Sequence, residues 1–388
     1  MSEPQSWVKV GCSNLEDGRE ALEQALQNLA LTDSPRLVVV LAASRYDLSE
    51  ISVALSGRLP DSRLIGCTTA GEIAAGSALT HSLVLWALGG TGVRVSTGFG
   101  RSDDQGLRQA AVEAASCLES LERLQHTVLV LLSDGLGGDQ MEVVRGAYDA
   151  ATIEVPLVGG CAGDYLAMRQ TLQLHGTTVM SGAVVAAAIS SERPLGVGVS
   201  HGWIPASEPM LVTDSRDTQL SSLDDRPALD VYLDFFDPPQ EVREDPQAFA
   251  DFAAIHPIGI RRRDRIEMRH ITGFDRDKRS LLMVAEVPQG ALAFLTRGDS
   301  ASVLEAAAES AASAIEGLGG NPAAGLLLFD CVSRRSIFGE RHVQEETDLI
   351  NRCSGGVPMA GFYTYGEIAR TKGSGGFHNQ TLVTLAIG

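Results

Sequence analysis

The sequence contains three segments that repeat the same order of predicted elements, and this repetition constrains the fold more than any single motif. Each segment has an apolar strand, a helix, a glycine-rich strand and a second apolar strand. The three sets of strands read LVVVL, LIGCTTAGEIA and HSLVLWALGG; VLVLL, PLVGGCAGDYL and TTVMSGAVVAAAI; and GLLLF, PMAGFYTYGEIA and NQTLVTLAIG. Self-similarity of this kind is typical of a supersecondary unit that recurs along a chain. We therefore expect three copies of one unit.

A further strand and a long helix precede each copy. The strands are predicted at WVKVGCSN, VRVSTGFG and ALAFLTRG. The helices that follow begin near Asp or Ser and carry Ala and Leu three and four positions apart, as expected of a helix that packs on a sheet. Strands such as LVVVL show no alternation of apolar and polar residues, which indicates that both of their faces are covered. The predicted fold class is α/β with mixed α+β sheets, built from three β-α-β-α-β-β units.

A segment of different composition, residues 195–289, lies between the second and third copies. It contains several short predicted strands and one helix, ALDVYLDFFDPPQ, which we expect to end at Pro238 and Pro239 because proline lacks the backbone N–H that a helix needs. We interpret the segment as a β-rich insertion. A domain boundary is predicted near Arg226, giving residues 1–225 with two units and residues 226–388 with the third unit and most of the insertion.

Each copy has a loop in which two glycines are followed by an acidic residue. The glycines and acids are Gly66, Gly71 and Glu72; Gly159, Gly163 and Asp164; and Gly361, Gly366 and Glu367. A phosphate-binding loop would carry lysine where these loops carry acid, so a nucleotide phosphate is not expected. Two interpretations stay open. The acids bind backbone N–H groups at the junctions of the units, or they face a shared cavity and pair with an ammonium group of a ligand.

Charge and composition exclude several functions. A formal charge of −18 and an isoelectric point near 4.8 disfavour nucleic acid and anionic membranes as partners. The chain has no basic and apolar leader and no run of about 20 apolar residues, so we expect a soluble, cytoplasmic protein. No hydrolase motif is present. Cys67 and Cys161 occupy equivalent loops, but neighbouring carboxylates do not activate a thiol, and we predict that the protein is not an enzyme.

Six ordered segments closely resemble the FIST sensory module with its N-terminal and C-terminal parts. They are SRYDL, IGCTTAGEI, VGGCAGD, GVGVSHGWIP, IHPIGI and GFYTYGEIA. The resemblance implies a role in bacterial signal transduction as a sensor of a small ligand. A free-standing chain of this size is similar to haem-based nitric-oxide-sensing proteins. That similarity implies haem b as cofactor and, as partner, a separately encoded histidine kinase, diguanylate cyclase or phosphodiesterase. A homo-oligomer is also compatible with the sequence.

Haem would need an imidazole ligand and an apolar, aromatic pocket. The candidates are His256, which precedes Pro257, and alternatively His201, which lies beside Gly202 and Trp203. The alternative function is a cofactor-free module that binds an amino-acid-like solute. The residues expected to contact the ligand in one or other of these interpretations are His256, His201, Trp203, Glu72, Asp164, Tyr363, Tyr365 and Glu367.

Overall fold

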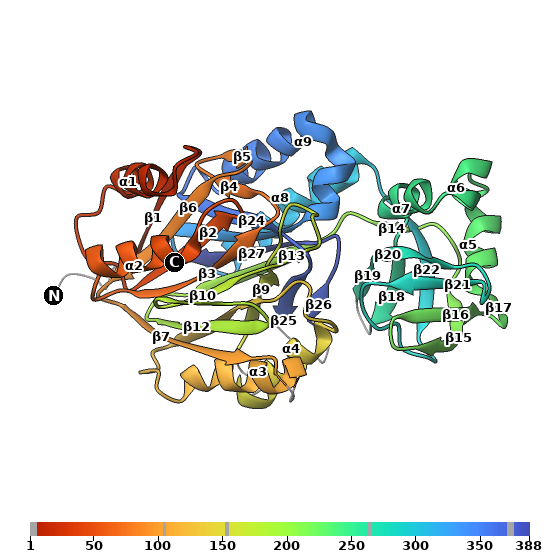
Figure 1. The fold of residues 1–388 in the computed structure, drawn as a ribbon, viewed down its shortest axis with the longest axis horizontal. Helices are drawn as coiled ribbons and strands as arrows, with labels where there is room; N and C mark the ends of the chain where they lie inside the picture. Colours follow the sequence, from red (N-terminus) through yellow and green to blue (C-terminus); the bar gives the residue numbers. More distant parts are fainter. Residues whose placement is uncertain (1–5, 104–105, 152–154, 263–264, 371–375) are drawn as a thin grey trace.

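The computed structural model describes residues 6–103, 106–151, 155–262, 265–370 and 376–388. A large body contains the first 200 residues and the C-terminal part of the chain, and a smaller β-rich part projects from it (Figure 1). The body has three six-stranded mixed sheets, and the smaller part has one nine-stranded sheet. The predicted fold class is confirmed.

Each sheet of the body is built around one unit. The first unit consists of β1 (Ser6–Ser13), α1 (Gly18–Leu29), β2 (Leu37–Ala43), α2 (Leu48–Arg58), β3 (Arg63–Thr69) and β6 (Leu83–Gly90). The second consists of β7 (Val93–Arg101), α3 (Gly106–Ala115) with the short 3-10 turn η1 (Ser116–Leu118), β8 (His126–Ser133), α4 (Met141–Ala151), β9 (Leu157–Cys161) and β12 (Ala183–Ser191). The third consists of β13 (Leu195–Ser200), α8 (Ser300–Glu316), β23 (Gly325–Cys331), α9 (Val332–Cys353), β24 (Met359–Thr364) and β27 (Leu382–Ile387).

One predicted strand belongs to a different sheet. The segment ALAFLTRG forms β22 (Leu292–Arg297) of the smaller part, and β13 takes its place as first strand of the third unit, paired with β27. Glycines explain this choice, because a Cβ on Gly196 or Gly198 would lie 1.8 Å from a carbonyl oxygen of α8. Gly11 has the same relation to α1, at 2.0 Å from the Ala25 oxygen. The insertion therefore interrupts the third unit between its first strand and first helix.

The three units exchange short hairpins around the body. After its glycine-rich loop, unit one adds β4 (Glu72–Ala74) and β5 (Ser77–Leu79) to the sheet of unit three. Unit two adds β10 (Gln173–His175) and β11 (Thr178–Met180) to the sheet of unit one. Unit three adds β25 (Glu367–Arg370) and β26 (Phe377–His378) to the sheet of unit two. Each glycine-rich loop is thus the point where the chain crosses from its own sheet to another.

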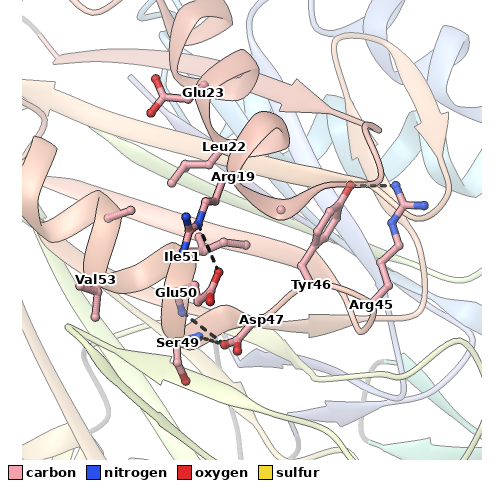
Figure 2. Close-up of a pocket in the computed structure, with 12 residues that line it drawn as sticks. Arg19, Leu22, Glu23, Arg45, Tyr46, Asp47, Ser49, Glu50, Ile51 and Val53 are labelled. Atoms are coloured by element: carbon pink, nitrogen blue, oxygen red, sulfur yellow. Dashed lines mark hydrogen bonds and ion pairs between the residues drawn. The ribbon is translucent and has the colours of Figure 1, made fainter.

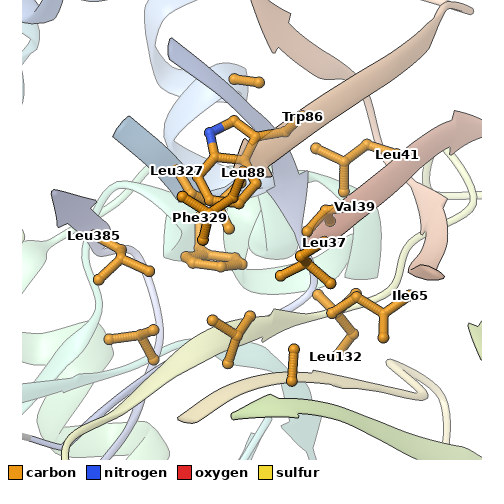
Figure 3. Close-up of a cluster of buried hydrophobic side chains, with 14 of the residues drawn as sticks. Leu37, Val39, Leu41, Ile65, Trp86, Leu88, Leu132, Leu327, Phe329 and Leu385 are labelled. Atoms are coloured by element: carbon orange, nitrogen blue, oxygen red, sulfur yellow. The ribbon is translucent and has the colours of Figure 1, made fainter. Parts of the chain in front are cut away.

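A single hydrophobic core fills the space between the three sheets. Figure 3 shows Trp86, Leu132 and Phe329, one from each unit, among the side chains of this core, and all three are fully buried. The indole Nε1 of Trp86 donates to the Leu326 carbonyl oxygen at 2.9 Å, which joins units one and three. Burying side chains of this size contributes about 1.5–3 kcal/mol each. The centre of the body is therefore a packed core.

The smaller part is the predicted insertion, although it spans residues 201–299 and not 195–289. Its strands are β14 (Ile204–Pro205), β15 (Met210–Arg216), β16 (Gln219–Leu223), β17 (Arg226–Pro227), β18 (Ile258–Arg262), β19 (Arg265–Arg269), β20 (Ile271–Asp275), β21 (Ser280–Met283) and β22. Its helices are α5 (Ala228–Phe236), α6 (Gln240–Glu244) and α7 (Pro246–Ala254). Helix α5 ends before Pro238, as predicted. The boundary predicted near Arg226 falls in β17, inside the insertion sheet.

Candidate functional site

The three glycine-rich loops meet at the centre of the body, where they bond directly to one another. The Ala70 amide donates to the Tyr363 carbonyl oxygen at 3.0 Å, and the Tyr363 amide donates to the Gly71 oxygen at 2.8 Å. The Gly163 amide reaches the Thr68 oxygen at 3.0 Å. A Cβ on Gly163 would lie 2.9 Å from Ala70, so the loops are in contact at this point. The loops come together as the sequence suggested, but they pack against each other, and neither cavity described below lies between them.

Glu72 is completely buried, and its carboxyl group accepts hydrogen bonds from neighbouring residues. The donors are the Thr69 hydroxyl, the Ser82 amide at 2.9 Å, the Ser82 hydroxyl at 2.6 Å and the Tyr165 hydroxyl at 3.0 Å. Burial raises the pKa of Glu72 even though these bonds oppose the shift. Thr69 ends β3 and Ser82 directly precedes β6, so the carboxyl group joins the two ends of the exchanged hairpin.

Glu367 has the same role in unit three. Its carboxyl group accepts from the Thr364 hydroxyl at 2.5 Å and from the Thr381 amide at 3.1 Å. Complete burial raises the pKa of Glu367 to about 8. The side chain is therefore largely protonated at neutral pH. A protonated acid attracts an ammonium ion much less than a carboxylate does.

Asp164 of unit two holds a turn of its own loop. It accepts from the amides of Met168 at 3.0 Å, Arg169 at 2.7 Å and Gln170 at 3.1 Å, and from the Tyr365 hydroxyl. Burial alone would raise its pKa, but these hydrogen bonds outweigh burial and lower the pKa of Asp164. All three acids are thus engaged by internal donors, which favours the first of the two interpretations. Their contact with a ligand stays a prediction.

A cavity lies where the insertion joins the body. This junction cavity has a volume of about 750 Å³. It is lined by the end of β13, the turn that follows it, the N-terminal half of α8, and Ile266 of β19. Two of the predicted residues, His201 and Trp203, belong to its lining. His378 lines it as well and bonds the Ala369 carbonyl oxygen through Nε2 at 3.0 Å.

A tight turn presses His201 and Trp203 against α8. Gly202, between them, has φ of +84°, and a Cβ there would lie 2.6 Å from the Ser302 carbonyl oxygen. Only glycine combines that backbone angle with so close an approach. The Trp203 amide donates to His201 Nδ1 at 3.0 Å. The Trp203 indole is 3% exposed, and its Nε1 has no hydrogen-bond partner among the described residues.

Two carboxylates of α8 belong to the wall of the junction cavity that this helix forms. Glu305 and Glu309 lie one helical turn apart on α8, and both are exposed. The Ser200 hydroxyl donates to Glu309 Oε2 at 2.7 Å. They are the acidic side chains among the described residues that line the cavity, and no lysine or arginine is found in that set. Burial lowers the pKa of His201, which is therefore neutral at pH 7. The wall thus has a negative charge that no basic lining residue offsets.

In each of the two histidines predicted as haem ligands, Nδ1 takes part in a hydrogen bond, and their role as haem ligands stays a prediction. His201 Nδ1 accepts from the Trp203 amide at 3.0 Å. His256 Nδ1 bonds the Phe252 carbonyl oxygen at 2.8 Å, and its ring stacks on Phe252 with centroids 4.1 Å apart. The bond at Nδ1 would leave Nε2 for a metal, but His256 lines neither of the two cavities. Among the described residues, no cluster of His, Cys, Asp or Glu is arranged to hold a metal ion.

A buried ionic cluster lies behind the junction cavity at the carboxyl ends of β23 and β24. Arg334 Nε donates to Asp330 Oδ1 at 2.8 Å, and Nη2 donates to Glu346. The side chains of all three residues are 0% exposed. Burial and the charge of Glu346 raise the pKa of Asp330. Tyr363 is buried nearby, and its hydroxyl has no partner among the described residues. Tyr365, by contrast, bonds Asp164.

Sequence reasoning missed the ionic cluster, although the sequence contains a signal for it. Asp330 and Arg334 stand four positions apart directly after the apolar strand GLLLF. The carboxyl ends of parallel strands are where α/β folds bind ligands. Charged residues at this point of the third unit therefore indicate a candidate site that the glycine-rich loops do not.

The second cavity, of about 660 Å³, lies between α1 and α2 in unit one. Figure 2 shows Leu22 and Ile51 between the two helices and Arg45 bonded to the Tyr46 hydroxyl. Arg19 and Glu50 form an ion pair at 3.6 Å across it. No residue predicted from the sequence lines this cavity. It is a groove of mixed charge with no orphaned buried polar group in its lining.

None of the described helices is both long enough and apolar enough to cross a bilayer.

Comparisons with known proteins identify two adjacent family matches. The model of the FIST N domain matches residues 36–226, and the model of the FIST C domain matches residues 228–370. Two uncharacterized proteins of Mycobacterium tuberculosis, MT0656 of strain CDC 1551 / Oshkosh and Rv0628c of strain ATCC 25618 / H37Rv, are each 24% identical over 399 residues. Each match covers 96% of this chain and 97% of the relative. A solved structure, T. maritima PurL complexed with ADP, is 10% identical and matches 98% of this chain and 71% of that chain, with a TM-score of 0.22 that supports no conclusion about fold.

Proposed function

The chain belongs to the FIST family, and on this premise we propose that it is a sensory module that binds a small molecule in the junction cavity. Members of this family are sensory, ligand-binding modules, and the six-segment resemblance is confirmed at that level. Small-molecule sites occur preferentially in clefts where two parts of a protein meet. A ligand held there contacts both the body and the insertion, so its binding can change how the two parts contact one another.

The lining of the junction cavity favours a ligand with a cationic head and an apolar body. Glu305 and Glu309 supply two carboxylates on one face of α8, because residues four apart on a helix have Cβ atoms about 6 Å from each other. Ile204 and Ile266 offer apolar surface for the body of such a ligand. An amino-acid-like or amine solute combines these properties. The observation that carries the proposal is the pair of carboxylates on one wall of a cavity without a basic lining residue.

Calorimetry on the whole chain tests this proposal. The probes are lysine, n-butylammonium and, as an anionic comparison, butyrate. We expect the two cations to bind and butyrate not to bind. The variant Glu305→Gln/Glu309→Gln should lose at least about tenfold in affinity, because each charged hydrogen bond contributes about 1.5–3 kcal/mol. The control is Glu316→Gln, which removes one negative charge from the far end of α8, outside the cavity.

Two results would contradict the proposal. One is preferential binding of butyrate. The other is equal affinity of the double variant and the control for the cations. Salt provides a further check, because ionic contacts at an exposed carboxylate weaken as ionic strength rises.

The haem-based alternative requires an imidazole ligand from His201 or His256. It needs Nε2 of His201 or of His256 to reach the iron in a pocket that can hold the porphyrin. The output partner that the family resemblance implies is a separately encoded histidine kinase or cyclic-di-GMP enzyme. In either version, such a partner would respond to the contact between body and insertion. An absorption spectrum of the protein after addition of haem b separates the two versions.

A further inference from the structure

The buried guanidinium group of Arg334 bonds to two of the segments that line the junction cavity. Arg334 Nη1 donates to the His201 carbonyl oxygen at 3.2 Å, at the start of the turn that carries Trp203. Arg334 Nη2 donates to the Val303 carbonyl oxygen at 3.2 Å, in the first turn of α8. The turn and the helix are adjacent walls of the cavity. A single side chain of α9 therefore connects two segments separated by the whole insertion.

The ionic partners of Arg334 fix the orientation of its guanidinium. Asp330 holds Nε at 2.8 Å, and Glu346, three turns further along α9, holds Nη2. With its Nε and Nη2 bonded to carboxylates, the planar group can point its remaining N–H groups in only one direction. That direction is toward His201 and Val303. Buried ion pairs of this kind are weak evidence for stability, and their better-attested effect is to specify one arrangement.

We propose that Arg334 is a positioning residue that holds the His201–Trp203 turn against α8 and so sets the affinity of the junction cavity for its ligand. This inference rests on the proposed function for its ligand part, but the positioning itself can be measured without any ligand. Lysine cannot replace arginine here, because one ammonium group cannot reach two carboxylates and two carbonyl oxygens in different directions.

Acrylamide quenching of Trp203 fluorescence tests the positioning in the ligand-free protein. The chain has three tryptophans, so the signal of Trp203 is taken as the difference between each variant and the same variant carrying Trp203→Phe. In the triple variant Arg334→Met/Asp330→Asn/Glu346→Gln, no unpaired charge is left in the interior, and we expect the quenching constant of Trp203 to rise toward that of an exposed indole. The matched control Asp330→Asn keeps the guanidinium, its charged partner Glu346 and its bonds to both carbonyl oxygens, and should leave Trp203 protected.

The variant Arg334→Lys decides the question if the triple variant does not fold. It keeps a positive charge beside both carboxylates, and we again expect Trp203 to become accessible. Unchanged quenching of Trp203 in a folded triple variant or in Arg334→Lys overturns the proposal.

Binding of lysine and n-butylammonium to the same variants completes the test. We expect at least about tenfold weaker binding when Arg334 is replaced, with unchanged binding in the control. If the wild-type protein binds neither probe while Trp203 still becomes accessible, the proposed function fails and the positioning role stands. If the probes bind wild type and the Arg334 variants equally, the role of Arg334 in affinity is refuted while the proposed function stands.

Discussion

Replacing Glu367 by glutamine should change how the stability of the protein depends on pH. Burial raises the pKa of this acid from 4.5 to about 8 in the folded state. The unfolded chain releases the proton near 4.5, so between these two values the folded protein binds more protons than the unfolded chain. The free energy of unfolding of the wild type therefore falls as pH rises through this window. Glutamine does not titrate, and its amide can donate to Thr364 and accept from Thr381 in place of the protonated acid.

The magnitude follows from the linkage between protons and folding. One proton contributes a slope of about 1.4 kcal/mol per pH unit inside the window, with an upper bound of roughly 5 kcal/mol above pH 8. Glu367→Gln should remove this slope. A constant offset between the two proteins carries no information, because glutamine and glutamic acid differ in hydrogen bonding as well as in titration.

Urea unfolding followed by circular dichroism measures the effect between about pH 5 and about pH 9, a range that covers most of the window between the ordinary and the raised pKa and extends above it. The difference in free energy of unfolding between Glu367→Gln and wild type should grow in favour of the variant as pH rises. Glu316→Gln, on the exposed surface of α8, is the matched control and should run parallel to the wild type. If Glu367→Gln also runs parallel, the acid is ionised in the folded protein. Our assignment of Glu367 as a neutral structural group would then be wrong, and the ammonium-binding interpretation would return.

Three further predictions concern other parts of the structure. Gly202→Ala should lower the free energy of unfolding by about 1–3 kcal/mol more than Gly290→Ala, as measured by thermal unfolding. Both positions have strongly positive φ, but only at Gly202 would the Cβ meet a neighbouring backbone. Equal losses would refute the close packing of the turn on α8. Tyr165→Phe should lower the free energy of unfolding by about 1–3 kcal/mol, because it removes the hydroxyl that donates to Glu72 and accepts from the His81 amide; urea unfolding measures this, and no change would mean that water replaces the hydroxyl. Adding haem b should give no Soret band that depends on His201, whereas a histidine-ligated spectrum that disappears in His256→Ala would support the haem prediction made from the sequence.

The units of the body could be predicted from the sequence because their signals are local. Apolar strands such as residues 37–43 can be recognised from their composition, and helices such as α4 from the spacing of their apolar residues. The exchange of hairpins could not be predicted, because β4 and β10 have three residues each and pair with strands far away in the sequence. Segments so short have no periodicity that specifies a partner. Their pairing is decided by the packing of the whole body.

In the third unit, β13 occupies the position that we predicted for β22, and the sequence contains a reason for this difference. Apolar content alone does not distinguish β13 from β22, since both are short strands between turns. The glycines of β13 do distinguish it, because a first strand must let a helix backbone approach it, as Gly11 and Gly100 do in the other units. Conversely, we assigned a possible function to the glycine-rich loops because two glycines and an acidic residue recur in each unit. The structure uses them as crossing points, and their acids are occupied by hydroxyl and amide donors.

The candidate site lies where the threefold repetition is broken, and the break explains why a cavity exists there. In unit one, a short loop leads from Ser13 at the end of β1 to Gly18 at the start of α1. In unit three, the whole insertion occupies the corresponding connection, and the chain turns sharply at Gly202 and returns only at Asp299 to begin α8. The first turns of α8 therefore face Ile266 of the insertion across the junction cavity instead of a short loop. Among the described parts of the body, unit three alone combines this opening with the Arg334 cluster behind it, so we expect a ligand bound there to contact one unit of the body and the insertion.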